Sequence, residues 1–190
     1  MSTAFDAFRY LVFENANWDP ATFNASTDIE RALRADRNDV LNSSSTDLKA
    51  FFDRGGKLLM YHGWNDAALP AEGTIQYFEN VRETMGADEV DQFARLFMVP
   101  AMGHCFGGPG PNAFDSLAVL DAWVESGSAP DRIVASKYAN DLAPLLNMPT
   151  GPALSTRPLC AYPAVARWKG DGSTNDEANF VCIVPPKADI

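Results

Sequence analysis

Two side chains that could exchange a proton follow two apolar segments of the chain. Asp66 lies in "HGWNDAALP", after the apolar residues 57–61, and His104 lies in "MGHCFGGPG", after the apolar residues 94–99. Each apolar segment predicts a buried strand followed by a helix. Neighbouring parallel strands end at one edge of a sheet, so we expect the two side chains to meet there. A carboxylate bonded to one imidazole nitrogen leaves the other nitrogen available as a general base.

Structural roles are open for the same residues. Asp66 could cap a helix that begins near Pro70, where Asp is common, and His104 could be a loop histidine beside turn-forming glycines. His62 precedes a glycine at the end of the first strand, a position that favours a structural role. Cys105, next to His104, could be a nucleophile or a disulfide partner.

Composition limits the possible partners. The chain has 190 residues, 46% of them hydrophobic, and a formal net charge of −10. This composition is typical of a globular protein, and the negative charge disfavours nucleic acid and anionic membranes as partners. No segment approaches the ~18 apolar residues of a membrane span, and the N-terminus shows no signal peptide. With two histidines, no CxxC pair and no GxGxxG or Walker sequence, we expect no metal and no cofactor.

The order strand, helix, strand, helix predicts an α/β fold with parallel strands joined by crossover helices. We expect one helix that ends at Gly86 and another that ends at Gly127. The second would have Leu117, Leu120 and Val124 on one side. Residues 131–138 predict a further short strand.

The ends of the chain differ in character from its middle. Near the N-terminus, Ser26 or Thr27 could cap one helix, and Ser45 or Thr46 a second, shorter one. From residue 140 onward Pro, Gly and Asn predict loops, and "KGDGSTNDEANF" is interpreted as a turn because it lacks the closing Glu of a calcium loop. We therefore expect a single domain, residues 1–190, with an N-terminal extension (1–45), a strand–helix core (46–139) and a loop-rich C-terminal segment (140–190).

Three segments carry a resemblance to a known family. "GGKLLMYHGWNDAALP", "MVPAMGHCFGGPGP" and "RPLCAYPAVARWKGDGSTNDEANFVC" resemble, in this order, the tannase and feruloyl esterase family. The resemblance implies an α/β-hydrolase fold in which Asp66 is the triad acid and His104 the triad base. It also implies a disulfide between Cys160 and Cys182. Cys105 corresponds to half of a disulfide whose other cysteine precedes the family's nucleophile.

The chain departs from the family pattern at the nucleophile. It contains no Gly-x-Ser-x-Gly elbow, so the resemblance implies only the C-terminal part of a truncated hydrolase domain, without lid or nucleophile region. Cys105 is then expected to be unpaired. Water activated by Asp66 and His104 is the first candidate for the nucleophile. The Cys105 thiol, a serine of residues 43–45 and a serine from a second subunit are the others.

Two functions remain. The first is a carboxylic ester hydrolase acting on feruloyl, galloyl or terephthaloyl esters, as small molecules or as a polyester surface, with Trp64 and Phe106 stacking on the acid and Leu69 facing it. The second is a non-catalytic fragment or pseudoenzyme that folds and self-associates. A homo-oligomer is expected in either case, because missing strands would expose a sheet edge. Family members are usually secreted or periplasmic, which leaves localisation open for a chain without a signal peptide.

Overall fold

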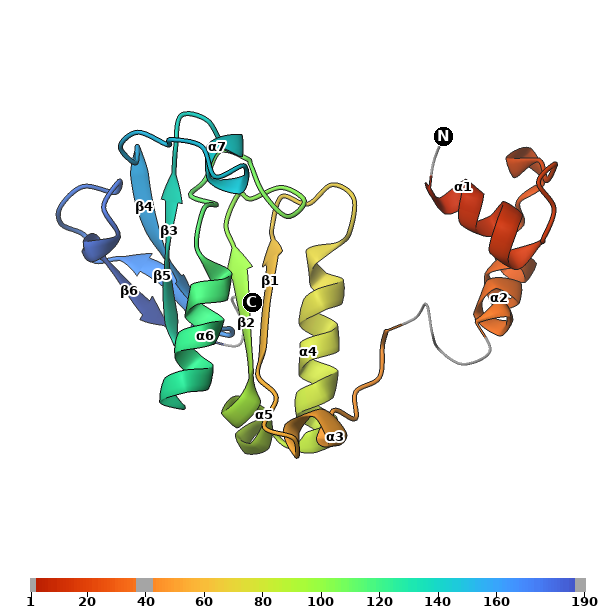
Figure 1. Ribbon diagram of the computed structural model, residues 1–190, viewed down its shortest axis with the longest axis horizontal. Coiled ribbons are helices and arrows are strands. Elements are labelled where there is room, and N and C mark those ends of the chain that lie inside the picture. Colours follow the sequence, from red (N-terminus) through yellow and green to blue (C-terminus); the bar gives the residue numbers. More distant parts are fainter. Residues whose placement is uncertain (1–2, 37–42, 187–190) are drawn as a thin grey trace. The chain divides into compact units, whose positions relative to one another are not determined.

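The computed structural model describes residues 3–36 and 43–186 (Figure 1). The chain forms two compact units, residues 1–45 and residues 46–190. That residues 1–190 form a single domain stays a prediction. None of the helices in the described residues is long and apolar enough to cross a membrane.

The first unit is helical and is organised around aromatic rings. Its elements are α1 (Thr3–Ala7), the π-helical η1 (Phe8–Val12), η2 (Pro20–Thr22) and α2 (Ala25–Ala35). Phe13 stacks on Trp18 with ring centroids 5.0 Å apart, and the Arg31 guanidinium lies over the Phe13 ring. Asn24 caps α2 by accepting a hydrogen bond from the Ser26 amide. The predicted caps, Ser26 and Thr27, are wrong because the helix begins earlier.

The second unit begins with a short helix and a parallel strand pair. After α3 (Lys49–Phe52), β1 (Leu58–Gly63) pairs in parallel with β2 (Ala94–Val99), so that Gly63 lies opposite Val99. The crossover contains α4 (Ala71–Met85), which ends at Gly86 as predicted, and α5 (Ala87–Phe93). Neither Ser45 nor Thr46 caps α3, whose first amide donates instead to the Asp47 side chain.

Alternate residues of the two strands face two separate hydrophobic clusters. On one face Leu96, with Leu58 and Met60, packs in the cluster that contains Phe78 and Val81 of α4. On the other face Phe97 and Val99, with Leu59, pack in the cluster that Val119 of α6 (Ser116–Ser126) joins. Because successive side chains of a strand point to opposite faces, α4 and α6 cover opposite faces of the pair (Figure 1).

The burial of β1 was predicted wrongly, and the buried side of α6 was not predicted. β2 is buried as expected, but β1 is only half-buried, because it pairs with no described strand on its other side. In α6, Leu117 and Val124 are exposed and Trp123 is buried instead. This helix is apolar on most of its circumference, and the side carrying its largest apolar residue faces inward, where Lys57 and Arg95 lie near the Trp123 ring.

The C-terminal segment contains strands where the sequence predicted loops. The predicted strand β3 (Arg132–Lys137) pairs antiparallel with β4 (Ser155–Cys160), and α7 (Leu142–Leu145) lies between them in the chain. Beyond β4, the Tyr162 amide donates to the Leu96 carbonyl and so joins this segment to β2. β5 (Val165–Trp168) pairs with β6 (Phe180–Ile183), and η3 (Glu177–Asn179) precedes β6. Strand pairing between distant residues overrides the local turn composition.

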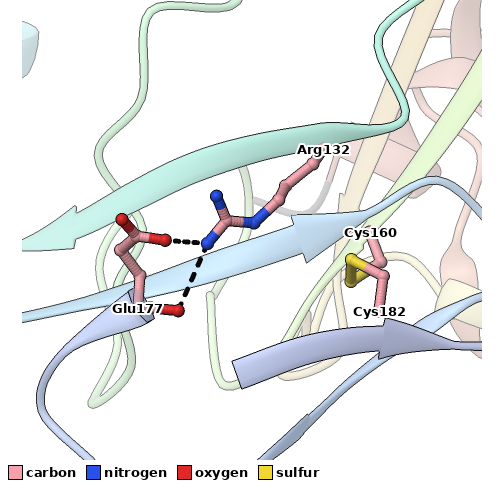
Figure 2. Close-up of a disulfide and its surroundings, with 4 residues drawn as sticks. All are labelled: Arg132, Cys160, Glu177 and Cys182. Atoms are coloured by element: carbon pink, nitrogen blue, oxygen red, sulfur yellow. Dashed lines mark hydrogen bonds and ion pairs between the residues drawn. A yellow bond between two sulfur atoms is a disulfide. The ribbon is translucent and has the colours of Figure 1, made fainter. Parts of the chain in front are cut away.

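The predicted disulfide between Cys160 and Cys182 is confirmed (Figure 2). It ties β6 to β4. Near it, Arg132 of β3 donates to the Glu177 carbonyl oxygen and pairs with the Glu177 carboxylate, which holds η3 against the same sheet (Figure 2). The disulfide and the Arg132–Glu177 pair thus add to the strand pairing that holds the C-terminal segment in place.

Removal of this disulfide should destabilise the second unit. The two cysteines are separated by 22 residues, and the loss of a crosslink that closes a loop of this size costs about 3 kcal/mol through the entropy of the unfolded chain. We expect a Cys160→Ala/Cys182→Ala double variant to lose about this much free energy of unfolding in urea titrations. Cys105→Ala, which changes an exposed free thiol, is the control; equal stability of the double variant and the wild type would contradict the prediction.

Gly63 lies where β1 meets the loop that follows β2. A Cβ at this position would lie 2.3 Å from the Met102 carbonyl oxygen and 2.6 Å from that of Gly103. Gly73, in α4, has no neighbouring atom within 4 Å of such a Cβ. Gly63→Ala should therefore destabilise by roughly 1–3 kcal/mol through overpacking, whereas Gly73→Ala should stabilise by up to about 1 kcal/mol. Thermal unfolding should give opposite signs for the change in stability of the two variants. A Gly63→Ala variant as stable as the wild type would show that Gly63 does not approach the loop after β2 so closely.

Candidate active site

The loops after β1 and β2 are joined by backbone hydrogen bonds. The Trp64 amide donates to the Val99 carbonyl oxygen over 3.0 Å, and the Asn65 amide donates to that of Met102 over 2.9 Å. Parallel pairing of the strands places both loops at one edge, and these bonds fix their register. The geometry of Asp66 and His104 therefore depends on the sheet.

The Asp66 side chain is almost fully buried and bonded on both carboxylate oxygens. It is 3% exposed. Oδ1 accepts hydrogen bonds from the Ala68 and Leu69 amides at 2.8 and 3.0 Å, and Oδ2 lies 2.7 Å from Nδ1 of His104. Asp66 thus closes its own loop, an Asx turn. It does not cap α4, which begins after Pro70 without a side-chain cap.

The hydrogen bond between Asp66 and His104 fixes the imidazole tautomer. This bond and those from the Leu69 and Ala68 amides hold the pKa of Asp66 well below its usual range, although burial opposes the shift. An ionised carboxylate only accepts hydrogen bonds, so Nδ1 of His104 carries a proton, and in the neutral ring Nε2 then has a free lone pair. The His104 side chain is 53% exposed, which makes the ring accessible to a ligand.

A tight turn carries His104. The Gly103 amide donates to the Gly107 carbonyl oxygen, and Cys105 within this turn has a positive φ of 66°. The Gly107 amide donates to the side-chain oxygen of Asn112, which is buried. The glycines around His104 therefore form the hydrogen bonds that define this turn.

Asn112 is held by a charged pair that sequence reasoning did not identify. Its amide nitrogen donates to the Gly110 carbonyl oxygen and to Asp141. Lys137 donates to Asp141 and to the Gly108 carbonyl oxygen. Burial raises the pKa of Asp141, but hydrogen bonds from Lys137 and Asn112 outweigh it and lower the pKa overall. A residue of β3 thus fixes the loop after β2.

His62, for which the sequence favoured a structural role, lies against Asp66. Its Nε2 is 3.2 Å from Asp66 Oδ2, the same oxygen that His104 contacts. Both histidines of the chain therefore meet one carboxylate. The position of His62 at the end of β1 was the signal available in the sequence.

The residues predicted to contact the substrate line three different cavities. A cavity of about 220 Å³ is lined by Asp66, His104, Leu69 and Cys105, together with Tyr61, His62, Gly63 and Met102. Phe106 lines a neighbouring cavity of about 590 Å³, which shares Tyr61 and Cys105 with the first. Trp64 lines a third cavity that contains neither Asp66 nor His104. Leu69 and Phe106 are thus near the Asp–His pair, and Trp64 is not part of that cavity.

No group of three or more His, Cys, Asp or Glu side chains is arranged to hold a metal ion in the described part of the chain. Cys105 is exposed and its thiol is free.

The low pKa of Asp66 predicts a pH-dependent contribution to stability. Because the folded-state pKa lies below the unfolded value of about 3.9, the carboxylate stabilises the fold at higher pH, and this contribution is lost as pH falls through the folded-state pKa. In urea titrations Asp66→Asn should be less stable than the wild type at pH 7. The difference should begin to shrink as pH falls below about 4. A difference that is the same at pH 7 and pH 3 would contradict this.

The chain is similar to known esterases along most of its length. The family model described as "Tannase and feruloyl esterase" matches residues 2–183. An uncharacterized esterase of Xanthomonas campestris is 39% identical over 95% of this chain and 36% of its own length. The mono(2-hydroxyethyl) terephthalate hydrolase of Piscinibacter sakaiensis is 50% identical over 76% of this chain and 22% of its own length.

Solved structures agree with these relatives. A crystal structure of an esterase from Aspergillus oryzae superposes with a TM-score of 0.83 at 33% identity, over 95% of this chain and 37% of that one. The fold is therefore part of an α/β-hydrolase fold, and the chain spans about a third of the length of the first of these relatives. The chain belongs to the tannase and feruloyl esterase family.

Proposed function

We propose that this chain contributes the acid–base half of an aromatic ester hydrolysis site, with His104 as general base and Asp66 as the acid that orients it. The observation that carries the proposal is the 2.7 Å contact between Asp66 Oδ2 and His104 Nδ1. Membership of a family of esterases supports the reaction class. The half-exposed imidazole and its cavity support access by a substrate.

The chemistry follows from the tautomer. His104 Nε2 removes a proton from the nucleophile as its oxygen or sulfur attacks the ester carbonyl carbon, and the Asp66 carboxylate stabilises the imidazolium that forms. The tetrahedral intermediate then collapses, the bond to the leaving alkoxide breaks, and His104 returns the proton to that oxygen. With water as nucleophile, the products are the carboxylic acid and the alcohol.

Water remains the first candidate for the nucleophile. No serine lines the cavity of the Asp–His pair in the described part of the chain, and a serine of residues 43–45 stays a further candidate. Cys105 lines the cavity with His104 and is the competing candidate. A serine of another subunit would add a third route.

The shape and lining of the neighbouring cavity support an aromatic acyl group. It contains Phe106 and Phe114, and the Tyr61 and Phe114 rings meet edge to face at 5.1 Å. Aromatic rings arranged in this way stack well on a further aromatic ring. We assign the acyl group to this cavity and the scissile carbonyl to the smaller one, where Leu69 faces it.

A folded protein with little turnover is the second candidate. It is favoured by the absence of a Gly-x-Ser-x-Gly sequence, since the residual activity of a site without its nucleophile depends on backbone donors elsewhere. The two candidates differ in the measured rate of ester hydrolysis.

Self-association and an oxidising environment complete the proposal. A homo-oligomer would cover the exposed Leu117 and Val124 on α6 and the edge of β1 that pairs with no strand of the described residues. A disulfide is typical of secreted or periplasmic proteins. Size-exclusion chromatography with light scattering should give a dimer or larger species, and a monomer at micromolar concentration would contradict self-association.

His104→Ala should abolish hydrolysis of p-nitrophenyl and feruloyl esters, because His62, the other imidazole that lines the cavity, already has partners on both ring nitrogens. Circular dichroism should show that the variant is folded. Cys105→Ala separates the two nucleophiles: retained activity supports water, and loss of activity supports the thiol. Wild-type activity in His104→Ala would overturn the assignment of the base, and absence of activity in the wild type would favour the second candidate.

A further inference from the structure

His62 makes contacts that the proposed hydrolysis does not use. It is the fifth residue of β1, and its side chain is 12% exposed. Nδ1 lies 2.7 Å from Thr74 Oγ1 in the first turn of α4. Nε2 lies 3.3 Å from the Leu69 carbonyl oxygen and 3.2 Å from Asp66 Oδ2. Each ring nitrogen therefore has a partner on a different segment.

The nature of these partners defines the tautomer of His62. A carbonyl oxygen and an ionised carboxylate both only accept hydrogen bonds, so Nε2 carries the proton and faces them. Nδ1 is then the acceptor, and the Thr74 hydroxyl donates to it. A neutral Nε2–H imidazole donates to the Leu69 carbonyl oxygen and lies beside Asp66 Oδ2; these two acceptors select the tautomer, and the Thr74 hydroxyl supports it by donating to Nδ1.

Two routes lead from His62 to the Asp66 carboxylate. One is the direct approach of Nε2–H to Oδ2. The other passes through Leu69, whose carbonyl oxygen accepts from His62 while its amide donates to Asp66 Oδ1. His62 thus contacts one carboxylate oxygen and holds the loop residue that bonds the other.

The two loop amides of Ala68 and Leu69 hold the carboxylate through Oδ1, whereas Oδ2 contacts the half-exposed His104 ring and the more buried His62 ring. His62 is fixed by a strand, by α4 and by the loop. The His62 Nε2 lies beside Asp66 Oδ2, the oxygen that accepts the hydrogen bond from His104. It therefore limits rotation of the carboxylate when the His104 ring moves.

We propose that His62 is a positioning residue: held by Thr74 and by the Leu69 carbonyl oxygen, it fixes the Asp66 carboxylate in the orientation that bonds His104. This inference rests on the proposed function for its catalytic consequence, but its structural content does not depend on turnover. A histidine that merely linked β1 to α4 would leave the state of the His104 ring unchanged when removed.

Ring-nitrogen NMR of the protein labelled with ¹⁵N-histidine tests the tautomer directly. The chain has two histidines, so the two sets of signals can be assigned with His104→Ala. We expect His62 as the Nε2–H tautomer in the wild type. Thr74→Val, which keeps the shape and removes the hydroxyl, should weaken this preference and shift the His104 signals. Thr74→Ser, which keeps the hydroxyl, should give wild-type spectra.

Kinetics test the consequence for the reaction. His62→Phe should lower kcat for an aromatic p-nitrophenyl ester by about tenfold, as expected for loss of a residue that orients a reacting group, with little change in KM. His62→Gln, whose amide N–H can occupy the place of Nε2–H, should recover part of the loss. If His62→Phe does not fold, Thr74→Val replaces it.

The outcomes separate the two proposals. His62 as the Nδ1–H tautomer, or His104 signals unaffected by Thr74→Val, would overturn the positioning role. An inactive wild type with the expected tautomers and shifts would overturn the proposed function and leave the positioning role supported. An equal loss of kcat in His62→Gln and His62→Phe, with unchanged His104 signals, would identify His62 as structural only.

Discussion

The Asp66 carboxylate is the group on which the candidate site depends. Burial of an isolated carboxylate is unfavourable, and here it is compensated by two loop amides and by His104, with His62 alongside. These donors come from the loops after β1 and β2 and from β1 itself. The carboxylate therefore links the same three segments whose N–H groups stabilise its charge. The same contacts place a proton on Nδ1 of His104, as the proposed role of general base requires. Site chemistry and local stability therefore depend on one group.

Much of the second unit could be predicted from hydrophobic pattern and turn residues. The strands expected at residues 57–61 and 94–99 form at Leu58–Gly63 and Ala94–Val99, and Gly86 and Gly127 end helices, because these signals are local. The C-terminal strands could not be predicted, since they form by pairing with residues far away in the sequence. The inward face of α6 was missed because several of its faces are apolar, and only packing selects among them.

The site was predictable to the extent that strand order determines it. Asp66 and His104 follow successive parallel strands, so the order of the strands is enough to expect that they meet. The contact of His62 with Asp66 depends on where α4 presents Thr74, and the support of the His104 loop depends on Asp141. These contacts join residues whose proximity is created only by folding. The family resemblance assigned roles to the pair but did not indicate these supports.

The central claim is that the Nδ1–H of His104 donates to an ionised Asp66 in the folded protein. Proton NMR in water observes this group directly, as a low-field resonance coupled to the His104 ring nitrogen. We expect this resonance in the wild type, and we expect it to move to higher field or disappear in Asp66→Asn while the protein stays folded. A His104 ring protonated on Nε2 instead, or a low-field resonance unchanged in Asp66→Asn, would contradict the claim.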